Sequence, residues 1–227
     1  PEQLKTISPF SKNVHVILDS HGEFPMLPFS RSTKNGPREV LWEGMPATLR
    51  GIAQIAPALR ATRESLNLKL DFVTDLNYFQ LLGKYFRRET SSLLKHSLGE
   101  VYPNSEIIPW SRESLVSAAK ESDLAIIPID LSSPLQYLKP ENRLLIMWRL
   151  GLPCLTSPSP AYIRVTKAAG VDTVCYSLTD WTEKFSEILT DSEIAEAIVS
   201  SGQSYLKENH NSELVLQKWD RVFQSVL

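Results

Sequence analysis

The segment 122–157 constrains the fold more than any other part of this sequence. It begins with a continuous apolar run at 124–128, which is typical of a strand buried on both faces of a parallel sheet. A polar loop and a helix follow, and the helix breaks at Gly151-Leu152-Pro153 before a second short apolar run. Two buried strands joined by a crossover helix predict a βαβ unit with parallel strands.

The same alternation of short apolar runs and amphipathic segments continues along most of the chain. It predicts an α/β fold, a Rossmann-like doubly wound parallel sheet flanked by helices. A proline at position 57 lies inside the first long helical pattern and predicts a kink or a division of that helix. The expected strands are 39–42, 68–73, 106–108, 124–128, 153–156 and 173–176. The expected helices are 47–65, 78–97, 112–121, a helix after residue 141, 160–169, 180–189, 192–209 and 212–227.

Composition excludes several classes of protein. Hydrophobic residues make up 42% of the 227, charged residues 22%, and the formal net charge is −2. These values are ordinary for a globular domain and do not favour nucleic acid or a broad electrostatic membrane footprint as a partner. No apolar run is long enough to cross a bilayer. The two cysteines, Cys154 and Cys175, fall in expected buried strands and predict core residues in a cytoplasmic protein, with no disulfide or metal site.

The first 38 residues differ from the rest. They hold one strand candidate, 14–18, and a stretch rich in proline and serine at 24–37. We interpret 1–38 as a linker or the tail of a missing N-terminal domain, and 39–227 as a Rossmann-like domain. A lone histidine in this first segment, His21, is either a general base or a structural residue.

The helix that starts after residue 141 is the best candidate for an anion site. In a parallel sheet its N-terminus lies at the carboxyl ends of the strands, where its free N–H groups and its dipole attract negative charge. Arg143 pairs with a phosphate or is a surface charge. Asn142 binds a phosphate or sugar hydroxyl, or caps the helix. Lys139 adds a second cation, or is simply solvated.

Other candidates lie in loops at the same expected rim of the sheet. Trp110 stacks on a base, lines its pocket, or is a partly buried surface residue. Gly44 lets a ligand come close or makes a tight turn, and Glu43 bonds a ribose or sugar hydroxyl or caps the next helix. Ser132 and Ser133 bond sugar hydroxyls or serve as turn residues.

Over about 38–227 the sequence resembles the C-terminal, donor-nucleotide-sugar-binding half of GT-B glycosyltransferases. The segment 143–153 resembles the family's basic, Leu-Leu, Gly-x-Pro motif, with Arg143 in the place of a phosphate-binding lysine. Leu41-Trp42-Glu43-Gly44 resembles the family's opening strand and turn, and 123–128 and 157–162 resemble a later strand and turn. The resemblance implies that the donor-binding residues are the candidates named above.

Two features depart from the family pattern. Many retaining members carry two glutamates separated by seven residues before the Gly-x-Pro motif, and the matching positions here are Leu138 and Ile146. The arginine and lysine that often follow the first strand are not evident. The chain is therefore a divergent member, uses different diphosphate contacts, or is a degenerate domain.

The resemblance implies a transferase that moves a sugar from a nucleotide-sugar to a glycan or lipid-linked acceptor in polysaccharide biosynthesis. The donor is a substrate, and no metal or other cofactor is implied. This chain would carry mainly the donor half, so we expect it to lack most of the catalytic machinery without the missing N-terminal domain. Any membrane association is expected to come from the rest of the protein.

Two alternatives remain. The first is a catalytically degenerate GT-B-like scaffold or glycan-binding module, which the absent glutamates favour. The second is a nucleotide-sugar epimerase-like enzyme. The sequence contains neither G-x-G-x-x-G nor G-x-x-x-x-G-K-[ST], which argues against a typical NAD-binding or P-loop module.

Overall fold

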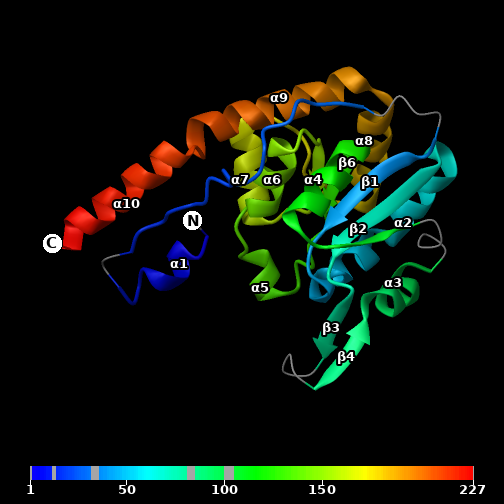
Figure 1. Cartoon of the computed structure of the whole chain (residues 1–227), viewed down its shortest axis with the longest axis horizontal. Coiled ribbons are helices and arrows are strands. Elements are labelled where there is room, and N and C mark those ends of the chain that lie inside the picture. The colour runs from blue at the N-terminus through cyan, green and yellow to red at the C-terminus, as the bar shows by residue number, and fades with distance from the viewer. Residues whose placement is uncertain (1, 12–13, 32–35, 81–84, 100–104, 227) are drawn as a thin grey trace.

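Five parallel strands form the central sheet of the computed structural model, which describes residues 2–11, 14–31, 36–80, 85–99 and 105–226. The strand order is β5-β2-β1-β6-β7, and helices lie on both faces of the sheet (Figure 1). The expected doubly wound α/β fold is therefore confirmed. The sheet strands are β1 (Arg38–Glu43), β2 (Leu68–Thr74), β5 (Ile107–Pro109), β6 (Leu124–Ile127) and β7 (Cys154–Thr156).

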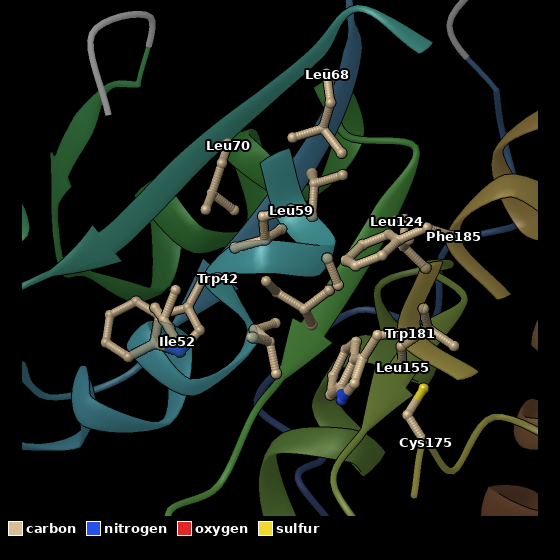
Figure 2. Packing of buried hydrophobic residues seen from close by; sticks show 14 of the residues in the cluster. Trp42, Ile52, Leu59, Leu68, Leu70, Leu124, Leu155, Cys175, Trp181 and Phe185 are labelled. Atoms are coloured by element: carbon tan, nitrogen blue, oxygen red, sulfur yellow. The ribbon is translucent and has the colours of Figure 1, made fainter. Parts of the chain in front are cut away.

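The helices divide between the two faces of the sheet. One core cluster packs α2, α3 and α8 on the sheet (Figure 2), and the other packs α4, α6 and α7, while α9 contributes to both. The helices are α1 (Leu4–Ile7), α2 (Arg50–Leu66), α3 (Thr90–Leu98), α4 (Arg112–Glu121), α5 (Pro134–Tyr137), α6 (Asn142–Arg149), α7 (Pro160–Ala169), α8 (Leu178–Thr190), α9 (Ser192–Asn209) and α10 (Ser212–Val226), with a short 3-10 turn η1 (Pro46–Thr48).

Strand β1 shows how the sequence builds both cores. Val40 and Trp42 belong to the cluster under α2, whereas Leu41 between them belongs to the opposite cluster. All three side chains are fully buried. Successive strand residues point to opposite faces, so a continuous apolar run is what a strand covered on both faces requires.

Helix α2 corrects one expectation. It runs unbroken through Pro57, so the predicted division of the helix is wrong. Pro57 lies on the exposed side, where water can satisfy the carbonyl of Ala53 that the missing N–H leaves unbonded. The opposite side of α2 is buried through Ile52 and Leu59, as the apolar spacing predicts.

The expected helix 78–97 is also wrong in its first half. The chain forms an antiparallel hairpin from β3 (Asn77–Gln80) and β4 (Phe86–Glu89), and a helix begins only at Thr90. Tyr-Phe pairs at 78–79 and 85–86 favour strands, and a glycine at position 83 is typical of a hairpin connection. Residues 81–84 themselves lie outside the described residues.

Two expected strands differ in extent. The strand predicted at 106–108 is displaced by one residue, and the preceding residues 101–104 lie outside the described part of the chain. The segment 173–176 makes only an isolated parallel bridge, between Val174 and Thr156, rather than a strand.

The N-terminal segment lies against the domain instead of standing apart from it. Residues 14–18 form no strand, so that prediction is wrong. Phe24 is buried in the core cluster that contains α6, and Arg149 Nε donates to its carbonyl at 3.1 Å. The Leu27 N–H bonds the carbonyl of Arg149 at 2.8 Å. The division at residue 38 remains a prediction about the whole protein.

We expect Gly51→Ala to destabilise the chain by about 1–3 kcal/mol, the usual cost of overpacking. A Cβ built at Gly51 would lie 2.4 Å from the carbonyl oxygen of Pro128, which belongs to the backbone just after β6. Gly36→Ala is the matched control, since a Cβ there meets nothing within 4 Å. Urea denaturation of both variants checks this: equal stabilities would contradict the close approach of α2 to the β6 loop.

Candidate functional site

The strand order places a topological switch point between β1 and β6. From the central β1 the chain adds β2 and β5 on one side, then crosses to add β6 and β7 on the other. Ligands of doubly wound sheets bind outside the carboxyl ends of the strands at such a point. Glu43 is the last residue of β1 and Gly44 follows it, and the connection after β6 leads to Lys139 and to Arg143 in α6.

Arg143 joins these two connections. Its Nη1 donates a hydrogen bond of 2.9 Å to the backbone oxygen of Glu43, across 100 residues of sequence. The charge of Arg143 also acts on the buried hydroxyl of Tyr162, on α7, and opposes the rise in its pKa to about 12 that burial causes. Arg143 is therefore held at the switch point as a positioned cation, and part of its hydrogen-bonding capacity holds the site together.

Gly44 makes room for that cation. A Cβ at this position would lie 2.8 Å from Trp42 Cζ2 and 3.0 Å from Arg143 Nη1. A side chain here would push against a buried ring and the guanidinium. The N–H of Gly44 donates to the carbonyl of Val73 at 3.3 Å and is not available to a ligand. Gly44 therefore contributes space for the guanidinium and not a hydrogen-bond donor.

Glu43 and Trp110 form the other side of the site. Trp110 Nε1 donates to Glu43 Oε1 at 3.1 Å, and the tryptophan is 49% exposed. Burial raises the pKa of Glu43, although the charges of Arg143 and Lys139 and the Trp110 hydrogen bond act in the opposite direction. Burial and the charge of Arg143 lower the pKa of Lys139, and Glu43 opposes this. Glu43, Gly44, Trp110 and Arg143 therefore lie together at the switch point, and Lys139 is near enough for its charge to act on Glu43, whereas donor binding by these residues stays a prediction.

We expect Glu43→Gln to stabilise the unliganded chain at neutral pH. The folded-state pKa of Glu43 lies above its ordinary value of 4.5, so the ionised carboxylate is disfavoured in the fold once the pH exceeds that range. Glutamine removes this cost and can still accept from Trp110. The gain in melting temperature should be full at pH values above the raised folded-state pKa, shrink as the pH falls through that pKa toward 4.5, and be absent below about 4.5. A loss of stability at pH 7 would contradict the raised pKa.

Three other predicted residues make their described contacts with residues outside this group. Asn142 lines a cavity of about 280 Å³ with Ile17 and Trp219, on the side of α10. The expectation that it caps the helix is wrong, because Glu141 occupies the cap position and no side chain caps α6. Ser132 Oγ donates to Asp130 at 2.6 Å. Ser133 precedes α5 without a side-chain cap bond, so both serines are turn residues here.

The sequence interpretation missed Arg50 and Asp130. Asp130 follows β6, is 2% exposed, and accepts hydrogen bonds from Gln54 and Ser132, which lower its pKa. Arg50 opens α2, and its Nε lies 3.2 Å from Asp130 Oδ2, with 73% of its side chain exposed. Arg50 is thus a cation that follows the first strand, where the sequence analysis found no evident arginine or lysine. The sequence pair Arg50-Gly51, at the start of the first long helix, could have indicated this cation.

A second missed pair supports the start of α6. Glu141, at the cap position, is fully buried, and both its carboxylate oxygens accept from Arg164 Nη2 at 3.1 and 3.0 Å. Arg164 also pairs with Glu2 at 3.0 Å, and these carboxylates raise the pKa of the guanidinium. This ion pair fixes α6 against α7 and hence the place of Arg143.

Two further features have none of these site side chains among their described contacts or lining. His21 is buried, has φ of 51°, and lies 3.7 Å from Glu23 in the N-terminal segment, so it belongs to no rim of the sheet. A cavity of about 220 Å³ beside Leu138 and Pro140 has no arginine or lysine in its lining. Among the described residues there is no group of three or more metal-ligating side chains, and no described helix could span a membrane.

Comparison with solved structures reveals the same architecture in glycosyltransferases. WaaG, a glycosyltransferase involved in lipopolysaccharide biosynthesis, matches 83% of this chain at 20% identity, with a TM-score of 0.62 over 48% of its own length. S. aureus TarM, in a complex with fondaparinux, α-GlcNAc-glycerol and UDP, matches 97% of this chain at 11% identity, with a TM-score of 0.64 over 42% of its length. Trehalose 6-phosphate synthase from Burkholderia multivorans matches 84% at 11% identity, with a TM-score of 0.61 over 43% of its length.

These matches establish the fold of the chain and not its donor, acceptor or activity. No protein-family model and no curated protein matches the sequence. The chain spans less than half the length of the solved structures just described. The resemblance to half of a GT-B glycosyltransferase is therefore confirmed as a likeness of fold.

Proposed function

We propose that this chain is the donor-binding part of a glycosyltransferase, which transfers a sugar from a nucleotide-sugar to a glycan or lipid-linked acceptor. The observation that carries the proposal is the set of four side chains at the switch point, Arg143, Lys139, Glu43 and Trp110, on a fold shared with glycosyltransferases. WaaG acts in lipopolysaccharide biosynthesis, which supports a role in polysaccharide assembly.

Each residue has a role that follows from its chemistry. Arg143 and the uncapped N-terminus of α6 would bind the diphosphate and stabilise the negative charge that develops as the sugar departs. Lys139 would add a second positive charge nearby. The half-exposed ring of Trp110 would stack on the base. The carboxylate of Glu43 would accept a hydrogen bond from a ribose or sugar hydroxyl, and these steps require no metal.

A degenerate scaffold or glycan-binding module is the second candidate, and one observation favours it. Leu138 and Ile146 occupy the positions of the two glutamates that the resemblance leads one to expect, and both are partly buried aliphatic residues. Neither can carry charge or transfer a proton. If catalysis persists, its acid, base or nucleophile must therefore come from elsewhere, including the half of the enzyme outside this chain.

Calorimetric titration of the 227-residue chain with UDP, GDP and ADP tests the proposal. We expect one nucleotide to bind with micromolar affinity, which would also identify the base. Failure of all three to bind would contradict the proposal for this chain and favour the scaffold. Incubation with the corresponding nucleotide-sugar separates the epimerase alternative, which requires conversion of the free nucleotide-sugar without an acceptor.

A further inference from the structure

The β3–β4 hairpin stands out from the rest of the fold. It leaves the carboxyl end of β2, projects away from the central sheet, and returns into α3 (Figure 1). Its two strands pair only with each other. A two-stranded ribbon is marginally stable by itself in water, so packing against another surface would stabilise the hairpin.

Large apolar side chains are exposed on this ribbon. Phe79 is 55% exposed and Phe86 56%, and Tyr85, just before β4, is 66% exposed. Every residue of β4 is exposed. Aromatic side chains gathered at the projecting part of a protein mark an interaction surface, whereas single exposed apolar residues do not.

Basic residues lie directly beside the aromatic ones. Arg87 is the cross-strand partner of Phe79, and Arg88 follows Phe86 by two positions on β4. Because side chains alternate along a strand, one face of the ribbon carries Phe79 with Arg87 and the other carries Phe86 with Arg88. Each face therefore carries an exposed aromatic ring, and a partner that covered only one face would leave the ring on the other face in water.

A lipid bilayer fits this surface better than a soluble small molecule does. Small ligands are bound in concave pockets, whereas these side chains stand on a convex projection. At a bilayer interface, aromatic rings sit among the headgroups and arginines pair with anionic phosphates. The ribbon can insert edge-on, which buries the rings of both faces at once. The chain's net charge of −2 excludes a broad electrostatic footprint but not this local one.

We propose that the β3–β4 hairpin binds the interface of an anionic lipid bilayer through Phe79, Tyr85, Phe86 and Arg87. The strand β3 contacts η1, the turn that follows Gly44, so the bilayer would lie at the rim that holds the candidate site. A lipid-linked acceptor would then reach the site from the membrane. The lipid contact itself does not depend on the proposed transferase function.

Co-sedimentation of the full chain with vesicles tests the proposal. We expect binding to mixed phosphatidylcholine–phosphatidylglycerol vesicles. The double variant Phe79→Ser, Phe86→Ser should lower the partition coefficient about tenfold, since two rings no longer enter the interface. Arg87→Gln should lower it about fivefold on the mixed vesicles and leave binding to pure phosphatidylcholine unchanged.

Tyr176→Ser is the matched control. Tyr176 is 65% exposed, close to Tyr85 in exposure, and lies between α7 and α8, outside the hairpin. We expect it to change partitioning by less than about twofold. Absence of binding to the mixed vesicles, unchanged binding of the double variant, or an equal loss in Tyr176→Ser would each overturn the proposal. If the double variant misfolds, Arg87→Gln decides alone by its dependence on anionic lipid.

Discussion

Arg164→Met is expected to destabilise the folded chain by about 2–4 kcal/mol, the largest loss of stability that we predict for a single substitution. The reason is Glu141, whose carboxylate is fully buried and takes both its hydrogen bonds from Arg164. Methionine keeps the length of the side chain but leaves a buried charge without a cation. The arginine side chain is itself 34% exposed, so the loss should fall short of that for a wholly buried pair.

A double substitution separates the charge from the packing. Glu141→Leu combined with Arg164→Met removes both ions together, and we expect it to recover much of the stability lost in Arg164→Met alone. Chemical denaturation of the single and double variants measures the coupling. If Arg164→Met and the double variant were equally unstable, the buried carboxylate would not be the cause.

Arg143→Ala is expected to weaken nucleotide binding by about 30-fold to 1000-fold, which corresponds to the loss of a bidentate or charge-assisted contact of a few kcal/mol. The affected contact is with the diphosphate, so nucleoside without phosphate should bind both proteins with similar weak affinity. The variant also loses the hydrogen bond to the Glu43 carbonyl, so its melting temperature must be compared with that of the parent chain.

Arg60→Ala is the control for the loss of a positive charge. Arg60 is exposed and lies in the second half of α2, away from the end of the helix that carries Arg50. It should leave the nucleotide affinity unchanged. Equal losses in both variants would indicate a general electrostatic effect, and unchanged affinity in Arg143→Ala would remove Arg143 from the binding site.

The sequence predicted the fold where local patterns and burial agree. The apolar run at β6 and the Gly-Leu-Pro break after α6 each have one structural solution. Parallel strands bring their carboxyl ends to one rim, which is why Glu43, Gly44 and Arg143 could be grouped although 100 residues separate the first from the last.

The remaining features depend on information that the local sequence does not contain. Consecutive residues on a helix point about 100° apart, so Asn142 and Arg143 diverge to different surroundings, and only packing decides which of them meets β1. The pairing of Glu141 with Arg164 joins two helices at no fixed spacing. The sequence predicts a helix where the hairpin forms because the aromatic residues of the hairpin imitate an amphipathic pattern.

A crystal structure of the chain with the nucleoside diphosphate that binds it most tightly would test the central claim most directly. Our account predicts the phosphates at the N-terminus of α6, within hydrogen-bonding distance of Arg143, and the base against the ring of Trp110. Phosphates located away from the switch point between β1 and β6, with Arg143 still bonded to the carbonyl of Glu43 and not to a phosphate, would contradict it.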